Sequence, residues 1–586
     1  MNLKPSTVWV PPTLIAILLV IFFVFMPQKG FWGIDAGIKT LAAQQIAQNG
    51  LSNYSIPHPG KSIDPSDRFY PYGPPFVLDR NERQVSVFSP LYQSIASLFW
   101  RFGGESGIRF LSILGTLIAF LGITFLLDNS RRLPWNGSSE DESFLSEARQ
   151  PKLQQQLVSM DLGKVSSLRT VDRDLGKVSS LRTVGRDLGF RSLLFPVLLL
   201  ISTPVLFYSL VIWEHTLFVG CIVWTFFLIN HNKKLLNVIA GLVLAFAVGL
   251  RPEGMLFLIG LLILYPKRIQ FLLGGFGVLI YPILYLQSLS TGSLIPIQWT
   301  ENLGLGQYTF DGFLVNFSVL LGFNDFFGID GYFLVPIVLL LLFTAIKGLK
   351  YVRLATSLLL VFIYSYLVIN RFISPTHPNL LASVTGILGC CPFIVLWWFF
   401  KSDSPFEKRL KWLMGGIITV SILVNPVAVG VHFGPRVLLP VIFIAAAFLL
   451  IKLPQLKNLY VKYLALFLLF ISIAFQFQGL SQQLVLRQNN SDMRTAIAEN
   501  VDSPLILSFW YHAGDLGPDI ENYIALHPGN YNGWLSTLNS LKSNGYSSFW
   551  RLSREFSTPI QNLPVEPTGK EFKGKYWQLK EYKIPE

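Results

Sequence analysis

The sequence predicts an all-α polytopic membrane protein with about thirteen transmembrane helices and a small external C-terminal domain of α/β or α+β type. Composition is the first reason. Of the 586 residues, 51% are hydrophobic and 14% are charged, and the mean hydropathy is +0.48, which is too apolar for a soluble domain. The second reason is that apolar runs long enough to cross a bilayer recur along most of the chain.

The apolar runs give the approximate positions of the helices. They are 11–27, 107–127, 193–213, 216–230, 235–250, 254–266, 270–288, 333–347, 355–370, 381–400, 413–431, 437–451 and 463–479. We interpret the first run as an uncleaved helix, because no small-x-small cleavage site follows it. The three cysteines, Cys221, Cys390 and Cys391, lie inside apolar segments and indicate neither a disulfide framework nor a metal site.

The net charge of +13 is concentrated on alternate connections between these runs. The long 128–192 connection and the loops near residues 233, 267, 350, 408 and 457 are rich in Lys and Arg, whereas the opposite short loops hold few cations, chiefly Arg251, Arg371 and Arg436. The positive-inside rule makes the first set cytoplasmic, which places the N-terminus in the cytoplasm and the C-terminal segment outside. The surplus therefore reflects topology, and no nucleic-acid partner is implied.

This topology divides the chain into a transmembrane domain, 1–479, and an external C-terminal domain, 480–586. The first external loop is 28–106. The cytoplasmic linker, 128–192, contains a tandem repeat in which 161–171 recurs at 175–185. Because the repeat is short, polar and rich in serine, we expect it to be a dispensable linker.

Charged and ionisable side chains gather at four external ends of the membrane segments. They are Asp35 in "GFWGIDAGIKTL", Glu214 and His215 in "SLVIWEHTLFVG", Arg251 and Glu253 in "VGLRPEGMLF", and His432 and Arg436 in "VGVHFGPRVLLP". Each charge at such a depth costs a few kcal/mol unless it is paired or wetted, so their gathering on one side predicts an outward-facing polar cavity. Asp35 alone fits a helix cap equally well, because the residues after it show helical spacing. The substitution Asp64→Asn, in the same loop, is expected to be nearly silent.

The chain resembles the C-type (GT-C) membrane glycosyltransferases, which include protein O-mannosyltransferases and bacterial aminoarabinose transferases. The resemblance lies in "GIDAGIKTLAAQQIAQNG", in "FSPLYQSIASLFWRFGGESGIRFLSILGTLIAFLG", in "GLRPEG" and in "FGPRVLLPVI". It implies a polyprenyl-phosphate monosaccharide donor, transfer to an acceptor on the external face with inversion, and a bacterial plasma membrane. Many relatives carry two adjacent acids where this chain has Asp35-Ala36. Any role that needs the second acid, such as binding a metal, must therefore be filled by another residue or be absent here.

The chemistry of such a transfer assigns roles to these residues. A hydroxyl acceptor needs a base, and Asp35 is the candidate. The departing lipid phosphate needs a fixed cation, for which Arg251 and Arg436 are the main candidates, followed by Arg109 and Lys39. Arg109 also fits an interface anchor, and Lys39 an i,i+4 partner of Asp35.

The remaining candidates are expected to bind substrate or metal. Glu214 or His215 would orient the acceptor or the sugar, or bind a divalent cation such as Mg²⁺ or Mn²⁺ together with Asp35; Glu253 and His432 belong to the same group. No cofactor is predicted with certainty. The acceptor, whether a protein, a glycolipid or a wall polymer, stays open.

Two other functions fit the same cavity. A flippase or transporter needs charged or broken-helix sites at mid-membrane, whereas the predicted spans are largely free of charge at their centres. An O-antigen polymerase or ligase also uses lipid-linked sugars, but such enzymes usually place their large external loop late in the chain. Here the loop that bears the motif is the first one.

Overall fold

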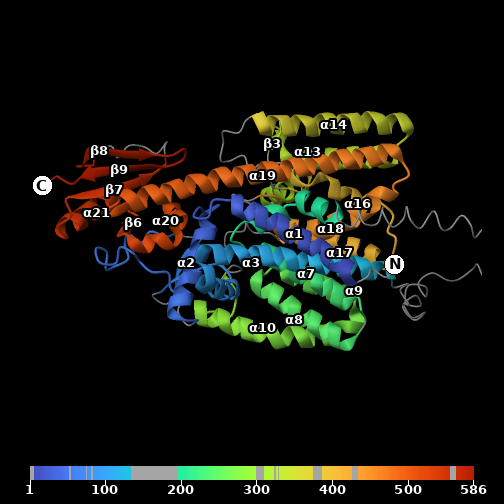
Figure 1. The fold of residues 1–586 in the computed structure, drawn as a ribbon, viewed down its shortest axis with the longest axis horizontal. Helices are drawn as coiled ribbons and strands as arrows, with labels where there is room; N and C mark the ends of the chain where they lie inside the picture. The colour runs from blue at the N-terminus through green and yellow to red at the C-terminus, as the bar shows by residue number, and fades with distance from the viewer. Residues whose placement is uncertain are drawn as a thin grey trace, which may run out of the picture.

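The computed structural model describes the chain except for residues 1–4, 52–53, 74–75, 81–82, 133–193, 232, 298–308, 323–324, 327–328, 374–385, 425–432, 555–562 and 586. The tandem repeat of the linker and His432 lie outside the described residues. Within these limits the chain forms a helical bundle that carries a small sheet domain at one end (Figure 1).

Five of the described helices are long and apolar enough to cross a membrane. They lie at Pro90–Asp128, Pro266–Thr291, Lys350–Ile369, Arg436–Gln455 and Leu459–Asn500, and six shorter apolar helices accompany them at Pro12–Phe25, His215–Ile229, Lys234–Leu250, Gly254–Leu264, Phe310–Leu321 and Phe333–Lys347. The chain therefore has the helices of an integral membrane protein. The total of about thirteen spans stays a prediction.

The helices follow the predicted apolar runs in order, except for α12, which lies between the predicted runs 270–288 and 333–347 and was not predicted. They are α1 (Pro5–Phe25), α3 (Pro90–Arg132), α7 (His215–Ile229), α8 (Lys234–Leu250), α9 (Gly254–Leu264), α10 (Ile269–Thr291), α12 (Phe310–Leu321), α13 (Gly331–Lys347), α14 (Lys350–Ile373), α17 (Pro405–Val424), α18 (Leu439–Lys452) and α19 (Leu459–Asn500). One contiguous core of buried aliphatic and aromatic side chains joins them.

Two predicted spans are broken rather than continuous. The run 193–213 ends a helix near residue 201 and resumes as the short α6 (Val205–Ser209), with Pro204 between the two pieces. The described part of the run 381–400, from residue 386 on, consists of α15 (Ile387–Cys390), the 3₁₀ turn η4 (Pro392–Val395) and α16 (Leu396–Phe399). Proline lacks the N–H that an uninterrupted helix needs, so each break has a local cause.

The C-terminal domain is a mixed α+β fold that begins later than predicted. α19 continues without interruption through the predicted boundary at residue 479 and ends at Asn500. A five-stranded sheet of order β6-β5-β7-β9-β8 follows, in which β6, β5 and β7 are parallel and β7, β9 and β8 are antiparallel. Its strands are β5 (Leu505–Leu507), β6 (Ala525–Leu526), β7 (Ser548–Ser553), β8 (Glu566–Lys573) and β9 (Gln578–Lys583), with α20 (Tyr511–Leu516), η7 (Gly517–Asn522) and α21 (Tyr531–Ser543) between them.

The first external loop contributes α2 (Ile34–Asn49) and the hairpin β1 (Val77–Arg80) and β2 (Arg83–Ser86). Helix α2 packs between α3 and the C-terminal domain, and Figure 1 shows it beside α20 at that end of the bundle. The contact is close: a Cβ on Gly37 would overlap the carbonyl oxygen of Gly514. Only glycine therefore fits at this point of α2.

Asp64 is a buried, hydrogen-bonded residue of this loop, which argues against its use as the silent control Asp64→Asn. Its side chain is 3% exposed. The carboxylate accepts hydrogen bonds from the backbone N–H of Phe69 at 2.6 Å and from the hydroxyl of Ser66 at 3.2 Å, and it lies 3.0 Å from Nε2 of His58. Its loss would leave buried donors without an acceptor.

Candidate active site

Seven of the nine candidate residues from the sequence lie in one cluster where α2 meets the ends of α7 and α8. They are Asp35, Lys39, Glu214, His215, Arg251, Glu253 and Arg436. Asp35 and Lys39 are one turn apart on α2, Glu214 and His215 begin α7, and Arg251 ends α8. The short turns before α7 and after α8 bring these ends to the same place as α2.

A buried ion-pair network forms the inner part of the cluster. Nζ of Lys39 lies 2.6 Å from Oε2 of Glu214, and Nη1 of Arg251 lies 3.0 Å from Oε1 of the same carboxylate. Nη2 of Arg251 lies 2.5 Å from Oε1 of Glu253. The side chains of Lys39 and Glu214 are only 2% and 4% exposed, so their charges are compensated by each other rather than by water.

Burial and charge act in opposite directions on this network. Burial raises the pKa of the Glu214 carboxyl, but the Lys39 ammonium and the Arg251 guanidinium outweigh it and hold that pKa below its ordinary value. Burial lowers the pKa of Lys39, against the attraction of Glu214 and Asp35. Glu214 is therefore an ionised carboxylate at neutral pH that is held between two cations.

The hydrogen bond to Arg251 defines the protonation of His215. Nη1 of Arg251 lies 2.9 Å from Nε2 of His215. Because a guanidinium can only donate, Nε2 must be the acceptor, which makes the imidazole neutral with its proton on Nδ1. The ring stacks on Tyr208 with centroids 4.8 Å apart and an interplanar angle of 8°, and the Tyr208 hydroxyl donates to the carbonyl of Phe433 at 2.8 Å. His215 thus fixes the direction of Arg251.

Asp35 and Arg436 form the open part of the cluster. Oδ2 of Asp35 lies 3.9 Å from Nη1 of Arg436, and their side chains are 20% and 26% exposed. The N-cap of α2 is Gly33, and Asp35 sits within the first turn. The helix dipole there favours its charge. Its position at the edge of the cluster leaves room for a further partner at the carboxylate.

Trp213 joins the open and the buried parts. Its ring lies 5.5 Å from Nζ of Lys39 and 5.7 Å from the guanidinium carbon of Arg436. It is 2% exposed, and it also packs against Tyr208 and His215. Neither Trp213 nor Tyr208 was predicted as part of the site, although Trp213 directly precedes Glu214 in the quoted motif. An aromatic residue next to a buried charge was the available signal.

Two of the predicted phosphate-binding residues are turned away from the opening. Lys39 is enclosed by the rings of Phe88 and Tyr92, in addition to its contact with Glu214. Arg109 is not in the cluster: it is 2% exposed and donates to the backbone carbonyls of Pro27 and Gly30 at 3.2 and 2.8 Å. Arg436 is the candidate cation that remains most accessible.

The described donor atoms do not converge as a metal site. No group of three His, Cys, Asp or Glu side chains comes together in the part of the chain that the structure describes. Both oxygens of Glu214 already face cations, and Nε2 of His215 faces Arg251. A divalent cation bound there would have to displace these contacts, so the mechanism proposed below uses none.

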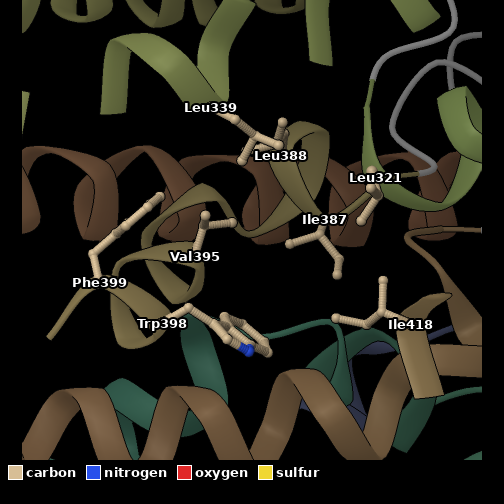
Figure 2. Close-up of a pocket in the computed structure, with 8 residues that line it drawn as sticks. All are labelled: Leu321, Leu339, Ile387, Leu388, Val395, Trp398, Phe399 and Ile418. Atoms are coloured by element: carbon tan, nitrogen blue, oxygen red, sulfur yellow. The ribbon is translucent and has the colours of Figure 1, made fainter. Parts of the chain in front are cut away.

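A separate apolar pocket of about 190 Å³ lies among α12, α13, α15, η4, α16 and α17. Figure 2 shows its lining side chains, which are Leu321, Leu339, Ile387, Leu388, Val395, Trp398, Phe399 and Ile418. The ring nitrogen of Trp398 donates to the carbonyl of Lys411 at 3.3 Å. The pocket shares no residue with the charged cluster, and its lining offers no charged group to a sugar or a phosphate.

Comparison with known proteins gives structural neighbours only. No family model and no curated protein matches the sequence. The chain is similar to ArnT from Cupriavidus metallidurans in the apo state, with 11% identity, a TM-score of 0.49 and coverage of 99% of both chains. It is equally similar to ArnT bound to undecaprenyl phosphate, with 11% identity, a TM-score of 0.49 and coverage of 97% of both chains.

A second neighbour is the oligosaccharyltransferase from Archaeoglobus fulgidus in the apo form. The identity is 13%, the TM-score is 0.42, and the match covers 94% of this chain and 69% of that chain. The identities and TM-scores of these likenesses are too low to carry an argument about the function of this chain.

Proposed function

We propose that this chain is a membrane glycosyltransferase that moves a monosaccharide from a polyprenyl-phosphate donor to an acceptor on the external face, with inversion at the anomeric carbon. One observation carries the proposal. A partly exposed carboxylate, Asp35, lies 3.9 Å from a partly exposed guanidinium, Arg436, at the end of an apolar helical bundle. This is the combination of base and anion-stabilising cation that such a transfer needs.

Asp35 acts as the general base. It accepts the proton of the acceptor hydroxyl as that oxygen forms its bond to the anomeric carbon, on the face opposite the phosphate. The bond between the anomeric carbon and the phosphate oxygen breaks, and its electron pair leaves with the polyprenyl phosphate. Attack opposite the leaving group inverts the anomeric configuration.

Arg436 stabilises the charge that develops on the departing phosphate. Because attack opposite the leaving group places the anomeric carbon between Asp35 and Arg436, the two side chains must move apart from their 3.9 Å contact when the substrates bind. That contact is longer than a hydrogen bond, so no short one is lost when the guanidinium donates to the phosphate. Protonation of Asp35 also removes the negative charge beside Arg436. The cation therefore becomes fully available when the phosphate leaves.

The buried network keeps these groups in place. Lys39 follows Asp35 by one helical turn and anchors α2 to Glu214 at the start of α7. Arg251 is fixed by Glu214, Glu253 and His215. Charges that are already oriented need no reorganisation during the reaction, and this is the main source of electrostatic catalysis.

Incubation of the purified protein with radiolabelled polyprenyl-phosphate sugars and candidate acceptors tests the proposal. We expect release of polyprenyl phosphate that depends on both donor and acceptor. Release of polyprenyl pyrophosphate from a pyrophosphate-linked donor would instead indicate a polymerase or ligase. Movement of intact lipid-linked sugar across vesicles, with no bond broken, would indicate a flippase.

A further inference from the structure

The turn that precedes α2 is held by three buried arginines that the mechanism above does not use. The turn spans residues 27–30, between α1 and α2. Arg109 comes from α3, and Arg487 and Arg494 come from α19, nearly four hundred residues further along the chain. Their residues are 2%, 2% and 5% exposed.

Every carbonyl of this turn accepts a hydrogen bond from one of the three guanidiniums. Arg109 donates to the carbonyls at positions 27, 28 and 30. Arg487 donates to the carbonyl at position 27 at 2.5 Å and to that at position 30 at 3.2 Å, and Arg494 donates to the carbonyl at position 29. The next backbone group, the N–H of Phe31, donates to Oδ1 of Asn490 at 2.8 Å.

The same side chains connect the turn to the rest of the molecule. Arg487 also donates to the carbonyl of Leu210 at 3.2 Å, in the segment that leads to Glu214. Arg494 pairs with Glu105 on α3 at 2.6 Å and with Asp519 in the C-terminal domain at 2.8 Å. Backbone contact at the turn is so close that a Cβ on Gly30 would overlap the carbonyl oxygen of Arg487.

Such an arrangement is unusual in its use of charge. A guanidinium carries a desolvation cost when it is buried, and carbonyl oxygens compensate it only if the geometry is fixed. Within the described part of the chain, the hydrogen bonds that Arg487 donates all go to backbone carbonyls.

We propose that Arg109, Arg487 and Arg494 form a clamp, hereafter the arginine clamp, that positions Asp35 against Arg436. The inference rests on the proposed function, in which Asp35 is the base. Asp35 follows the last clamped carbonyl by five residues and lies in the first turn of α2. Fixing the 27–30 turn therefore fixes where α2 starts, and with it the distance from the Asp35 carboxylate to the guanidinium of Arg436.

The clamp also gives the C-terminal domain a part in the reaction. Asp519 and the carbonyl of Asp515 bind Arg494 and Asn490, which hold the turn on the other side. The domain therefore acts on the position of Asp35 indirectly, through the α19 residues that hold the 27–30 turn. It is not needed as a source of residues for the open part of the cluster. These are positioning residues rather than catalytic ones.

Arg487→Lys tests the clamp, because it keeps the charge while a single ammonium cannot span three carbonyls. Asn490→Ala is a second, smaller change at the same turn. The matched control is Lys411→Met, which removes a buried cation that donates to the Phe400 carbonyl far from α2 along the chain. All variants are made in the full-length protein.

Two measurements distinguish positioning from stability. Nitroxides on cysteines introduced at the exposed residues Gln48 of α2 and Ser481 of α19 report the placement of α2, and the three native cysteines are buried and do not compete. We expect Arg487→Lys and Asn490→Ala to broaden or shift this distance distribution. Steady-state kinetics per folded protein should show kcat lower by roughly 10- to 100-fold with the donor KM within about twofold, since misplacement by an ångström suffices for such a loss.

Lys411→Met should lower the thermal stability and leave both the distance distribution and kcat unchanged. An unchanged distance distribution in the clamp variants would overturn the proposal, and so would an altered distribution with wild-type kcat. The distances are measured without substrate. They therefore test the clamp even if no donor is turned over, which would count against the proposed function instead.

Discussion

Replacing Glu214 with glutamine removes the one carboxylate that both Lys39 and Arg251 contact. The change keeps the shape of the side chain but takes from the Lys39 ammonium, which is 2% exposed, the carboxylate it is hydrogen-bonded to, and leaves only the weaker attraction of Asp35. Arg251 retains Glu253 at 2.5 Å, so the damage should fall mainly on Lys39. The expected result is a loss of stability rather than a direct loss of chemistry.

The magnitude follows from the burial of the pair. Removing one partner of a buried ion pair costs about 3–5 kcal/mol, because the other charge stays in a low-dielectric site. For a chain of 586 residues this corresponds to a fall of the unfolding midpoint of about 2–4 °C, because the entropy of unfolding grows with chain length. A second change, Lys39→Met, removes the stranded charge. The double variant should therefore recover at least half of the loss.

The assay is the thermal unfolding midpoint of the purified protein in detergent, measured for the wild type, both single variants and the double variant. Asp311→Asn is the control, because Asp311 lies in the first turn of α12, outside the cluster. If Glu214→Gln unfolds at the wild-type temperature, Lys39 is not dependent on Glu214. Additive losses in the double variant would refute the coupling even if each single variant is unstable.

Three further predictions concern the cation, the linker and the topology. Arg436→Gln should lower the rate of transfer by about 10²–10³, as expected for loss of one donor to a developing anion, and an unchanged initial rate would exclude Arg436 from this role. Excision of 161–187 should leave membrane insertion and transfer nearly unchanged, because the repeat has no periodic apolar face; loss of either would show that the repeat is structured or functional. Cysteines introduced at exposed positions of 490–580 should react with an impermeant reagent from the external side, and labelling only from the cytoplasm would invert the proposed topology.

The sequence predicted most of the helices and the gathering of charged side chains at their external ends, because both depend on local patterns. The spacing of Ile38, Leu41 and Ile46 indicated α2, which the structure describes as Ile34–Asn49. Charged residues in short turns on the same side of the predicted membrane indicated a shared cavity. In the structure, Glu214 contacts both Arg251 and Lys39 of α2.

The partners within the cluster could not be predicted in the same way. The i,i+4 rule suggested Asp35 as the partner of Lys39. In the structure, Nζ of Lys39 instead lies 2.6 Å from Oε2 of Glu214, which is 175 residues away in the sequence. A buried tertiary contact outweighs a weak helical pair, and nothing in the local sequence reports it. Arg109 was misjudged for the same reason: besides Glu105 one turn before it, its partners are backbone carbonyls that no sequence pattern marks.

Hydropathy also misjudged where α19 ends. The apolar run stops near residue 479, yet the helix continues to Asn500. Its last turns carry Arg487, Asn490 and Arg494, which face inward and are buried. Hydropathy does not distinguish a helix that buries polar side chains from a polar loop, because both have a low mean hydropathy. The arginine clamp was hidden by this same feature.

The most direct test of the proposed mechanism is the rate of sugar transfer by Asp35→Asn. The substitution keeps the shape of the side chain and removes its charge and basicity. Loss of a partly exposed pair with Arg436 should cost less than about 1 kcal/mol of stability, so folded protein should be obtained. Asp79→Asn is the matched control, because Asp79 is exposed on β1 of the same external loop. We expect Asp35→Asn to slow release of polyprenyl phosphate by about 100-fold or more while Asp79→Asn stays near the wild-type rate; an Asp35→Asn protein with wild-type transfer would contradict the assignment of Asp35 as the base.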